Sequence, residues 1–499
     1  MGSGYPAHRT EPAVVPVCYR TGTTAGSAFR ACSTLAAVAL AACCTVAQAA
    51  KPDLAPPSLL SPATRPTDPA PGIGTLNLLQ AWNKALVRDP IYSASQAFTS
   101  AEQEVVPQAR ARLLPYVQGN ALGEIDDNRR VGTLGNGSSK SRSVWALTLS
   151  QPLFDLGAWR NYERAEFVAE SATVAQTRAY QDLILRVAQA YFDILASQDT
   201  LRALLAEKSA IETQLRAAER GFELGSTTIA DTYEAQSRLD LINAGELQLR
   251  NTLQINHDKL ARIINERPAQ LAELSPGTAL PSPEPNRLDA WTTQASSANL
   301  AVAQASLSTR IVEKQIEIAK SERYPRIELQ AQTGSASDRG LYTLGTGGAP
   351  RSLDTTVGVQ LSIPLYTGGE ISSLIREQTS RLQQARYELE NAKRQAEQDT
   401  RQYFSGVTTG LAQIAVLQAA ERSSLASVKA NQTGYSVGVR VNIDVLNAQQ
   451  QLFETQRNLA QARYTTLMNS LRLKAATGTL SERDIVAVNS LLENTEPAR

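Results

Sequence analysis

Hydrophobic and polar positions alternate with a period of two in short segments of the chain, and this pattern predicts β-strands. In the clearest segment, Ile327, Leu329 and Ala331 alternate with Glu328 and Gln330. Successive side chains of a strand point to opposite faces, so each such segment has one apolar and one polar face. A noisier form of the alternation occurs twice in the first half of the chain. The four predicted strands are about 116–125, 143–151, 326–334 and 354–363.

After each second strand the apolar positions recur every three or four residues over a very long stretch, which predicts long helices. Neither of the two longest stretches contains a proline, and at ~1.5 Å per residue each helix would be on the order of 100 Å long. Leu382, Ala385 and Leu389 illustrate the seam of small and medium side chains, which is typical of coiled coils. A helix of this length cannot fold back on a compact core, so an ordinary helical bundle is disfavoured. The predicted long helices are about 158–222, 229–267, 370–436 and 443–477.

The chain contains this layout twice, and an internal repeat determines how the rest of a sequence is interpreted. Each copy has a helical segment (about 75–113 and 287–322), two strands, a very long helix, a turn with glycine and a second long helix. The matches that support the duplication are Trp82 with Trp291, Pro115 with Pro325, Pro152 with Pro364, Tyr191 with Tyr403, Gly225 with Gly438, and Asp231 with Asp444. Six matches in the same order exclude chance similarity. The predicted units are repeat 1 over 75–280, repeat 2 over 281–480 and a C-terminal tail over 481–499.

The N-terminal stretch is predicted to be a signal peptide over 1–49. A basic flank precedes an apolar run of ten residues, Leu35–Cys44, and an Ala-x-Ala cleavage site ends at Ala49. The run is about half as long as a membrane-spanning helix. A lipobox ending in Cys43 is a competing processing site, at which the cysteine would be acylated. Residues 50–74, rich in proline, alanine and serine, predict a flexible lead-in.

The composition excludes most kinds of catalytic site from the chain beyond its N-terminal stretch. All four cysteines lie in the first 44 residues, and His257 is the one histidine outside the N-terminal stretch. Zinc sites of Cys/His type, thiol nucleophiles and structural disulfides therefore lack their residues, and a Ser–His–Asp site would depend on His257. We expect no enzymatic activity, no catalytic residue, no cofactor and no metal. The net charge of +1 gives no electrostatic reason to expect nucleic acid as a partner.

The four strands have the length that an outer-membrane barrel requires, about nine residues each. Four strands cannot close into a barrel, because closure needs about eight. An open sheet would expose unpaired edges, which lipid does not tolerate. If the strands span a membrane, several copies of the chain must therefore share one barrel. The alternative is an open, soluble pair of β-hairpins packed on helices.

Several motifs resemble those of TolC-type outer-membrane channels over about residues 75–490. They are the Pro-Leu-Phe and Pro-Leu-Tyr strand ends, Tyr366-Thr367-Gly368-Gly369, and Tyr435-x2-Gly438-x-Arg440-x3-Asp444-Val445-Leu446-x-Ala448-Gln449. The resemblance implies an α+β membrane protein that forms a homotrimer. Three chains would share a 12-stranded outer-membrane β-barrel continuous with a 12-helix periplasmic α-barrel. The location implied is the outer membrane of a Gram-negative bacterium, extending into the periplasm.

The same resemblance implies a passive conduit that works with other proteins. Its partners would be a periplasmic adaptor (membrane fusion) protein and an inner-membrane transporter, with the ABC type favoured. Within the family the chain is more similar to the type I secretion branch, as in exporters of adenylate cyclase toxin, which implies an exit duct for a toxin-like protein cargo. The alternatives are the outer-membrane component of a multidrug efflux pump and, less favoured, a periplasmic coiled-coil adaptor, which should show a single helical hairpin flanked by compact β-domains.

The resemblance places a periplasmic gate at the two turns that join the long helices. Asp231 and Asp444 occupy equivalent positions in the repeats, just inside a helix start. In the gate interpretation, Asp444 forms a ring of three carboxylates that attracts cations and excludes anions. A second acid often follows one turn later in the family, and Asn447 stands there instead, so we expect weaker cation binding. Helix capping is the structural alternative, with Asp231 in a capping box and Asn442 as the cap of the helix that carries Asp444.

The resemblance also assigns Arg440 and Tyr435 as locks that bond across helices to the Asp231 region of a neighbouring turn. The residue before Asp231 is Ala230, so a hydroxyl partner that the family often has there is missing. A solvated arginine and an aromatic plug in the turn are the structural alternatives. The predicted gate residues are Asp231, Tyr435, Arg440, Asp444 and Asn447.

Overall fold

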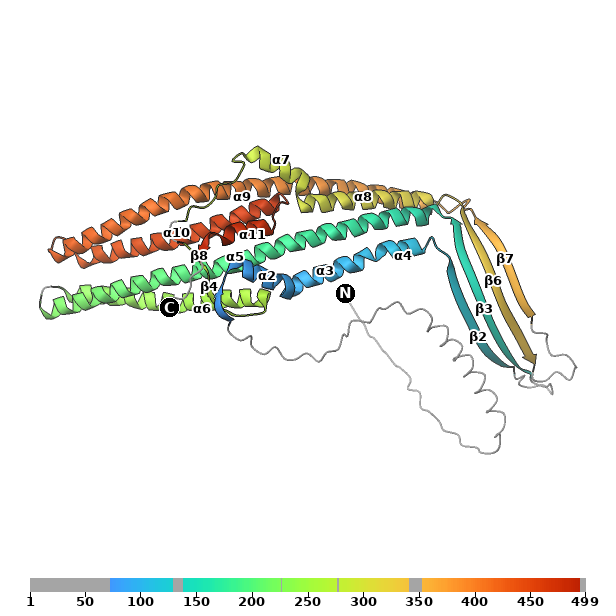
Figure 1. Ribbon diagram of the computed structural model, residues 1–499, viewed down its shortest axis with the longest axis horizontal. Coiled ribbons are helices and arrows are strands. Elements are labelled where there is room, and N and C mark those ends of the chain that lie inside the picture. The colour runs from blue at the N-terminus through green and yellow to red at the C-terminus, as the bar shows by residue number, and fades with distance from the viewer. Residues whose placement is uncertain (1–71, 129–137, 226, 276–277, 341–351, 494–499) are drawn as a thin grey trace, which may run out of the picture. The chain divides into compact units, whose positions relative to one another are not determined.

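Four long helices dominate the structure, which is a computed structural model (Figure 1). It describes residues 72–128, 138–225, 227–275, 278–340 and 352–493, so the predicted signal peptide and most of the predicted lead-in lie outside the described residues. The long helices are α5 (Leu156–Glu223), α6 (Ile229–Ile264), α9 (Glu370–Ser436) and α10 (Asn442–Ala476). Each lies within three residues of its predicted bounds at both ends.

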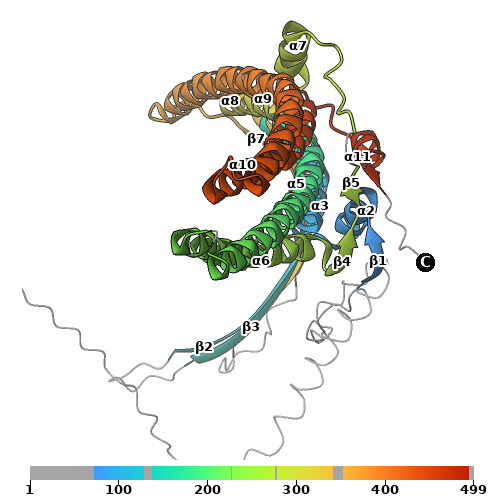
Figure 2. The ribbon, with the colours of Figure 1, turned by 90° about the vertical axis from the view of Figure 1, so that its left-hand side faces the viewer.

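The long helices form two antiparallel hairpins that meet along one seam. In each repeat the very long helix packs against the shorter one, α5 on α6 and α9 on α10, and α10 also packs on α5. The resulting order α6-α5-α10-α9 follows a curve when it is viewed along the helices (Figure 2). Among the described long helices, this curved layer ends at α6 on one side and at α9 on the other.

The helical segment predicted over 75–113 is three helices, which corrects that prediction. They are α2 (Leu78–Arg88), α3 (Pro90–Gln103) and α4 (Val105–Ala111). Asp89 ends α2 in an extended conformation and caps α3 by accepting the Tyr92 N–H at 2.9 Å. Pro90 then occupies the first turn of α3, where a missing N–H costs nothing.

The segment predicted over 287–322 is likewise divided, into α7 (Leu288–Ala298) and α8 (Leu300–Ser321). Asn299 separates them, because its side chain accepts the N–H groups of Ala301 and Val302 at 2.8 and 3.2 Å. Short polar side chains compete with the helix backbone for hydrogen bonds in this way. Such a cap interrupts the helix without interrupting the apolar stripe, so the stripe alone did not predict the break.

A four-stranded antiparallel sheet lies at one end of the helices (Figure 1). Its strands are β2 (Tyr116–Asn128), β3 (Ser138–Phe154), β6 (Arg326–Gly340) and β7 (Ser352–Ser362), in the order β2-β3-β6-β7. The β3–β6 pair joins the two repeats. β2, β3 and β6 are clearly longer than predicted, because polar residues beyond the predicted strand ends continue the ladder. Within the chain β2 and β7 each have one partner strand, so each has an outer edge without a ladder among the described residues.

A second group of short elements surrounds α5 about halfway along its length. Here β1 (Gly72–Leu76) pairs in parallel with β4 (Pro268–Leu271), and β5 (Glu273–Leu274) pairs with β8 (Leu492–Glu493). The fully buried Tyr191 of α5 places its hydroxyl 3.0 Å from the Leu76 carbonyl oxygen and 2.8 Å from that of Ala272. This single side chain ties the connector between the repeats to the start of the first repeat.

The predicted tail was 481–499, and its described residues, 481–493, are part of this group together with the end of the predicted lead-in, which corrects both predictions. The tail contains α11 (Glu482–Asn489) and β8, and Ile485 and Leu492 belong to the main hydrophobic core. Asn489 accepts a hydrogen bond from the Leu79 N–H at 3.1 Å. Segments from both ends of the described chain therefore close the same core.

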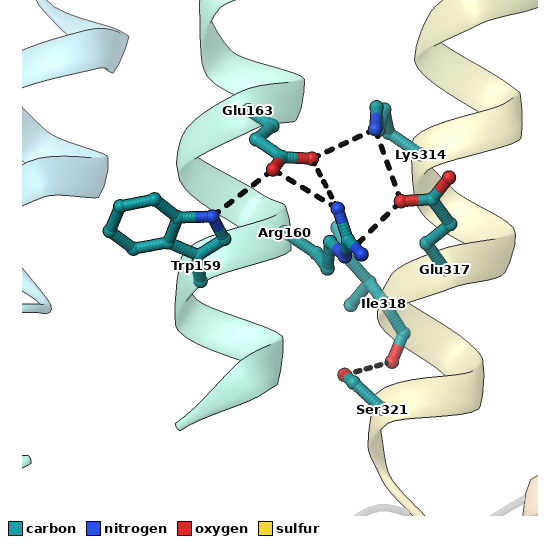
Figure 3. Close-up of polar contacts among 7 residues, drawn as sticks. All are labelled: Trp159, Arg160, Glu163, Lys314, Glu317, Ile318 and Ser321. Carbon is teal, nitrogen blue, oxygen red and sulfur yellow. Dashed lines mark hydrogen bonds and ion pairs between the residues drawn. The ribbon is translucent and has the colours of Figure 1, made fainter. Parts of the chain in front are cut away.

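An ion-pair network joins α5 to α8 near the sheet (Figure 3). Lys314 lies 2.8 Å from Glu163 and 3.1 Å from Glu317, while Arg160 lies 2.9 Å from Glu163 and 3.3 Å from Glu317. The Trp159 indole N–H adds a hydrogen bond of 3.1 Å to Glu163. The four alternating charges thus connect α5 of the first repeat with α8 of the second.

Candidate gate at the helix turns

Both turns between long helices reverse the chain around a glycine with positive φ. Gly438 has φ of 78° and donates to the Tyr435 carbonyl at 3.0 Å, and Gly225 has φ of 71° and donates to the Phe222 carbonyl at 2.9 Å. L-residues with a Cβ rarely adopt this conformation, so glycine is required at both positions. The equivalent glycines of the two repeats thus build equivalent turns.

Gly434 is needed for a different reason, because the Arg440 side chain packs closely against its Cα. A Cβ at this position would lie 2.7 Å from the Cγ of Arg440, and the Gly434 carbonyl accepts the N–H groups of Val439 and Arg440 at 2.9 and 3.1 Å. The stem of Arg440 therefore folds back over the last turn of α9.

Asp231 forms a capping box at the start of α6. Its carboxylate accepts the Thr228 N–H at 3.0 Å and the Thr228 hydroxyl at 2.7 Å. An acid at this position also interacts favourably with the positive end of the helix dipole. Within one chain, therefore, Asp231 acts as a helix cap, and its contacts with Thr228 lie at the exposed surface of the turn.

Tyr435 lies close enough to Asp231 for the two groups to interact electrostatically. Burial raises the pKa of the Tyr435 phenol, and the negative charge of Asp231 raises it further. Tyr435 lies at the end of α9 and Asp231 at the start of α6, so the turns of the two hairpins are neighbours.

Arg440 pairs with Asp444 within its own hairpin. The Nη1 and Oδ2 atoms are 3.6 Å apart, which is an ion pair rather than a short hydrogen bond, and the Arg440 side chain is 58% exposed. The resemblance assigned Arg440 to a bond with the Asp231 region of a neighbouring turn. Within one chain, Arg440 instead pairs with Asp444.

Asn442 does not cap α10, which corrects that alternative. The N-cap residue is Val441, and Asn442 is the first residue of the helix. Its side chain, 1% exposed, instead donates to the Asp231 carbonyl at 3.4 Å and accepts a hydrogen bond from the Gln214 amide of α5. A buried amide thus connects α10 to both helices of the first hairpin.

Asn447 accepts a hydrogen bond from an arginine that the sequence analysis missed. Arg238 of α6 donates from Nη2 to the Asn447 oxygen at 2.6 Å and from Nη1 to the Gln450 oxygen at 3.0 Å. The repeat offered no signal for Arg238, because the equivalent position in the second repeat is Gln451. The structure therefore brings all five predicted gate residues to one end of the helices and adds Arg238, Gln214 and Asn442.

The described residues contain no group of three or more His, Cys, Asp or Glu side chains placed to hold a metal ion. In the same residues no helix has both the length and the apolar character needed to cross a membrane.

The described chain is a duplicated strand–helix unit, with a sheet at one end of two long hairpins and paired turns at the other, and this layout is that of a family of outer-membrane proteins. The family model described as "Outer membrane efflux protein" matches residues 81–266 and 291–479. The chain belongs to this family, which places it in the outer membrane of a Gram-negative bacterium with its helices in the periplasm.

Curated relatives cover most of the chain. Outer membrane protein TolC of Escherichia coli K12 is 32% identical over 422 residues, 83% of this chain and 85% of that protein. The alkaline protease secretion protein AprF of Pseudomonas aeruginosa is 29% identical over 85% of this chain and 89% of its own length. The proteases secretion protein PrtF of Dickeya chrysanthemi is 30% identical over 82% and 90%.

Solved structures share the fold at lower identity. The outer membrane protein VceC of Vibrio cholerae matches with a TM-score of 0.68 and 19% identity, over 80% of this chain and 96% of that one. The CmeC outer membrane channel of Campylobacter jejuni matches with a TM-score of 0.70 and 16% identity, over 84% and 90%.

Proposed function

We propose that this protein is the outer-membrane exit duct of a tripartite type I secretion system that exports a toxin-like protein. The observation that carries the proposal is the match, over more than four fifths of the chain, to AprF and PrtF, whose names describe protease secretion. The duct is passive and has no enzymatic activity. It docks to a periplasmic adaptor protein and to an inner-membrane transporter of ABC type, and its signal peptide directs export.

The duct is a homotrimer in this proposal. The exposed edges of β2 and β7 pair with neighbouring copies, so that three four-stranded sheets form one 12-stranded barrel. The lateral faces of α6 and α9 meet in the same way, and twelve helices form the tunnel. Exposed apolar side chains on one face of the sheet, among them Val117, Leu147 and Val359, then face lipid.

The constriction lies at the turns and is formed by Asp444, Asn447, Asp231, Arg440 and Tyr435. Three copies of Asp444 make one acidic ring, and Asn447 adds no charge to it. The ring favours cations over anions at the entrance. It opens when the two hairpins of each chain separate.

Deletion of the gene tests the cargo. A protein that disappears from the medium, accumulates in the cells and returns with the complementing gene supports secretion. An unchanged set of secreted proteins would contradict it. Heat-modifiable trimers in the outer-membrane fraction are expected, whereas a protein in the soluble or inner-membrane fraction would favour an adaptor instead of a duct.

Drug efflux is the second candidate, favoured by one relative. The outer membrane efflux protein BepC of Brucella suis is 26% identical over 80% of this chain and 84% of its own length. The same deletion strain separates the two functions, because efflux predicts hypersensitivity to drugs with an unchanged set of secreted proteins.

A further inference from the structure

Arg238 links the two helical hairpins close to the predicted constriction. The hairpins meet mainly along α5 and α10, whereas Arg238 extends from α6, the helix farther from the seam. It binds two acceptors on α10, Asn447 at 2.6 Å and Gln450 at 3.0 Å. Residues three positions apart lie on one face of a helix, so the two amide oxygens match the fork of a single guanidinium.

Several contacts hold the guanidinium in this place. Glu234 of the same helix lies 3.8 Å from Nη2, and the Arg238 side chain is only 21% exposed. Ala235 of α6 and Leu446 of α10 are both fully buried in one apolar cluster. Ala235 lies three residues before Arg238, on the same side of the helix, and Leu446 directly precedes Asn447. The polar bridge therefore lies beside a packed contact between the same helices.

The charged side chains around Arg238 come from α5, from α10 and from its own helix, α6. Glu207 of α5 is buried and pairs with Arg457 of α10 at 3.0 Å, and Arg238 also acts on the Glu207 carboxylate. Two acids thus act electrostatically on Arg238, Glu234 of its own helix and Glu207 of α5, while its hydrogen bonds go to two neutral amides. Bonds from a cation to neutral amides do not depend on a carboxylate remaining ionised.

We propose that Arg238 is a further gate residue, which clasps the first hairpin to the second through Asn447 and Gln450 and keeps the constriction closed. The inference rests on the proposed duct and deepens it, since it identifies what holds the gate. Asn447, which weakens the acidic ring, gains a different role as the acceptor of the clasp. The Arg238 charge, placed one turn behind Asp444, also reduces the preference of the entrance for cations.

Single-channel recording in planar bilayers tests the clasp with Arg238→Gln, Arg238→Lys and a control, Arg250→Gln. Arg250 lies on the same helix and pairs with Glu246 within α6. Arg238→Gln should increase the ratio of open to closed events roughly tenfold, the equivalent of about 1.4 kcal/mol, and raise cation selectivity. Arg238→Lys retains the charge without the fork, so opening should increase while selectivity stays near that of the wild type.

Hydrogen exchange in detergent provides a second measurement that needs no current. Amides in the first turns of α10 should exchange faster in Arg238→Gln than in Arg250→Gln. Equal exchange and equal opening in these two variants would overturn the clasp. A wild-type protein that forms no pores would instead overturn the proposed duct, and the exchange rates would still decide whether Arg238 clasps the hairpins.

Discussion

The guanidinium of Arg186 binds the carboxylate of Asp89 through two hydrogen bonds, 3.1 Å from Nη1 and 2.7 Å from Nη2. Asp89 is 2% exposed and caps α3, while Arg186 belongs to α5. The pair therefore attaches the first helical segment of the repeat to α5, the long helix that leads to the first turn.

Arg186→Ala should lower the free energy of unfolding by about 3–5 kcal/mol, because it leaves a buried carboxylate without its cation. Chemical denaturation of the detergent-solubilised protein measures the change. Arg178→Ala, at an exposed position on the same helix, is the matched control and should have little effect. Equal losses for the two variants would contradict the prediction.

Acid should destabilise the protein, and Asp89 contributes to this effect. Burial alone would raise the pKa of Asp89, but the Arg186 hydrogen bond and the Tyr92 N–H together hold it below its usual value. The Lys314 hydrogen bond likewise lowers the pKa of Glu163. A lowered folded-state pKa gives stability that is present above the unfolded-state pKa of about 4 and is lost as the pH falls through the folded-state value. Unfolding measured from about pH 6 down to about pH 3 should show this loss, and Arg186→Ala should lose less than the wild type.

Asn442→Leu should loosen the contact between the hairpins. The substitution removes the partner of the Gln214 amide and of the Asp231 carbonyl, and an unsatisfied buried polar group costs about 1–3 kcal/mol. Thermal unfolding and hydrogen exchange of the first turn of α6 measure the effect. Asn458→Leu on the exposed side of α10 is the control, and a similar change in both variants would assign the effect to hydrophobicity instead.

Arg440→Ala should raise single-channel conductance. The substitution removes the ion partner of Asp444 and the stem that covers Gly434, so the second turn loses contacts on two sides. Bilayer recordings compare it with Arg422→Ala, an exposed-helix control on α9. Unchanged conductance in Arg440→Ala would remove Arg440 from the gate.

The alternation at Ile327, Leu329 and Ala331 located a strand but not its end. The β6 ladder continues to Gly340 through serine, glycine and aspartate, because backbone hydrogen bonds set the length of a strand and these small polar residues carry no alternating signal. The apolar stripe likewise predicted where helices lie but not where one helix ends and the next begins. It passes through Asp89 and Asn299, where side-chain caps interrupt the backbone without changing the stripe.

The repeat located the two turns at which the resemblance places a gate, but not the contacts that the side chains make there. Asp231 and Asp444 occupy matching places in two copies of one turn, so comparison of the halves found them. Arg238 and Asn447 are 209 positions apart and belong to no shared motif. Their contact depends on how the hairpins pack, which periodicity within one helix does not encode.

The pairing of β5 with β8 makes closure of the main hydrophobic core depend on the last segment of the described chain. Leu274 of β5 pairs with Leu492 of β8, and contacts between segments so far apart in the sequence form slowly because of the loop-closure entropy. A chain that ends before α11 would lack Ile485 and Leu492, so we expect such a truncation to leave the apolar side chains around Tyr191 exposed to solvent.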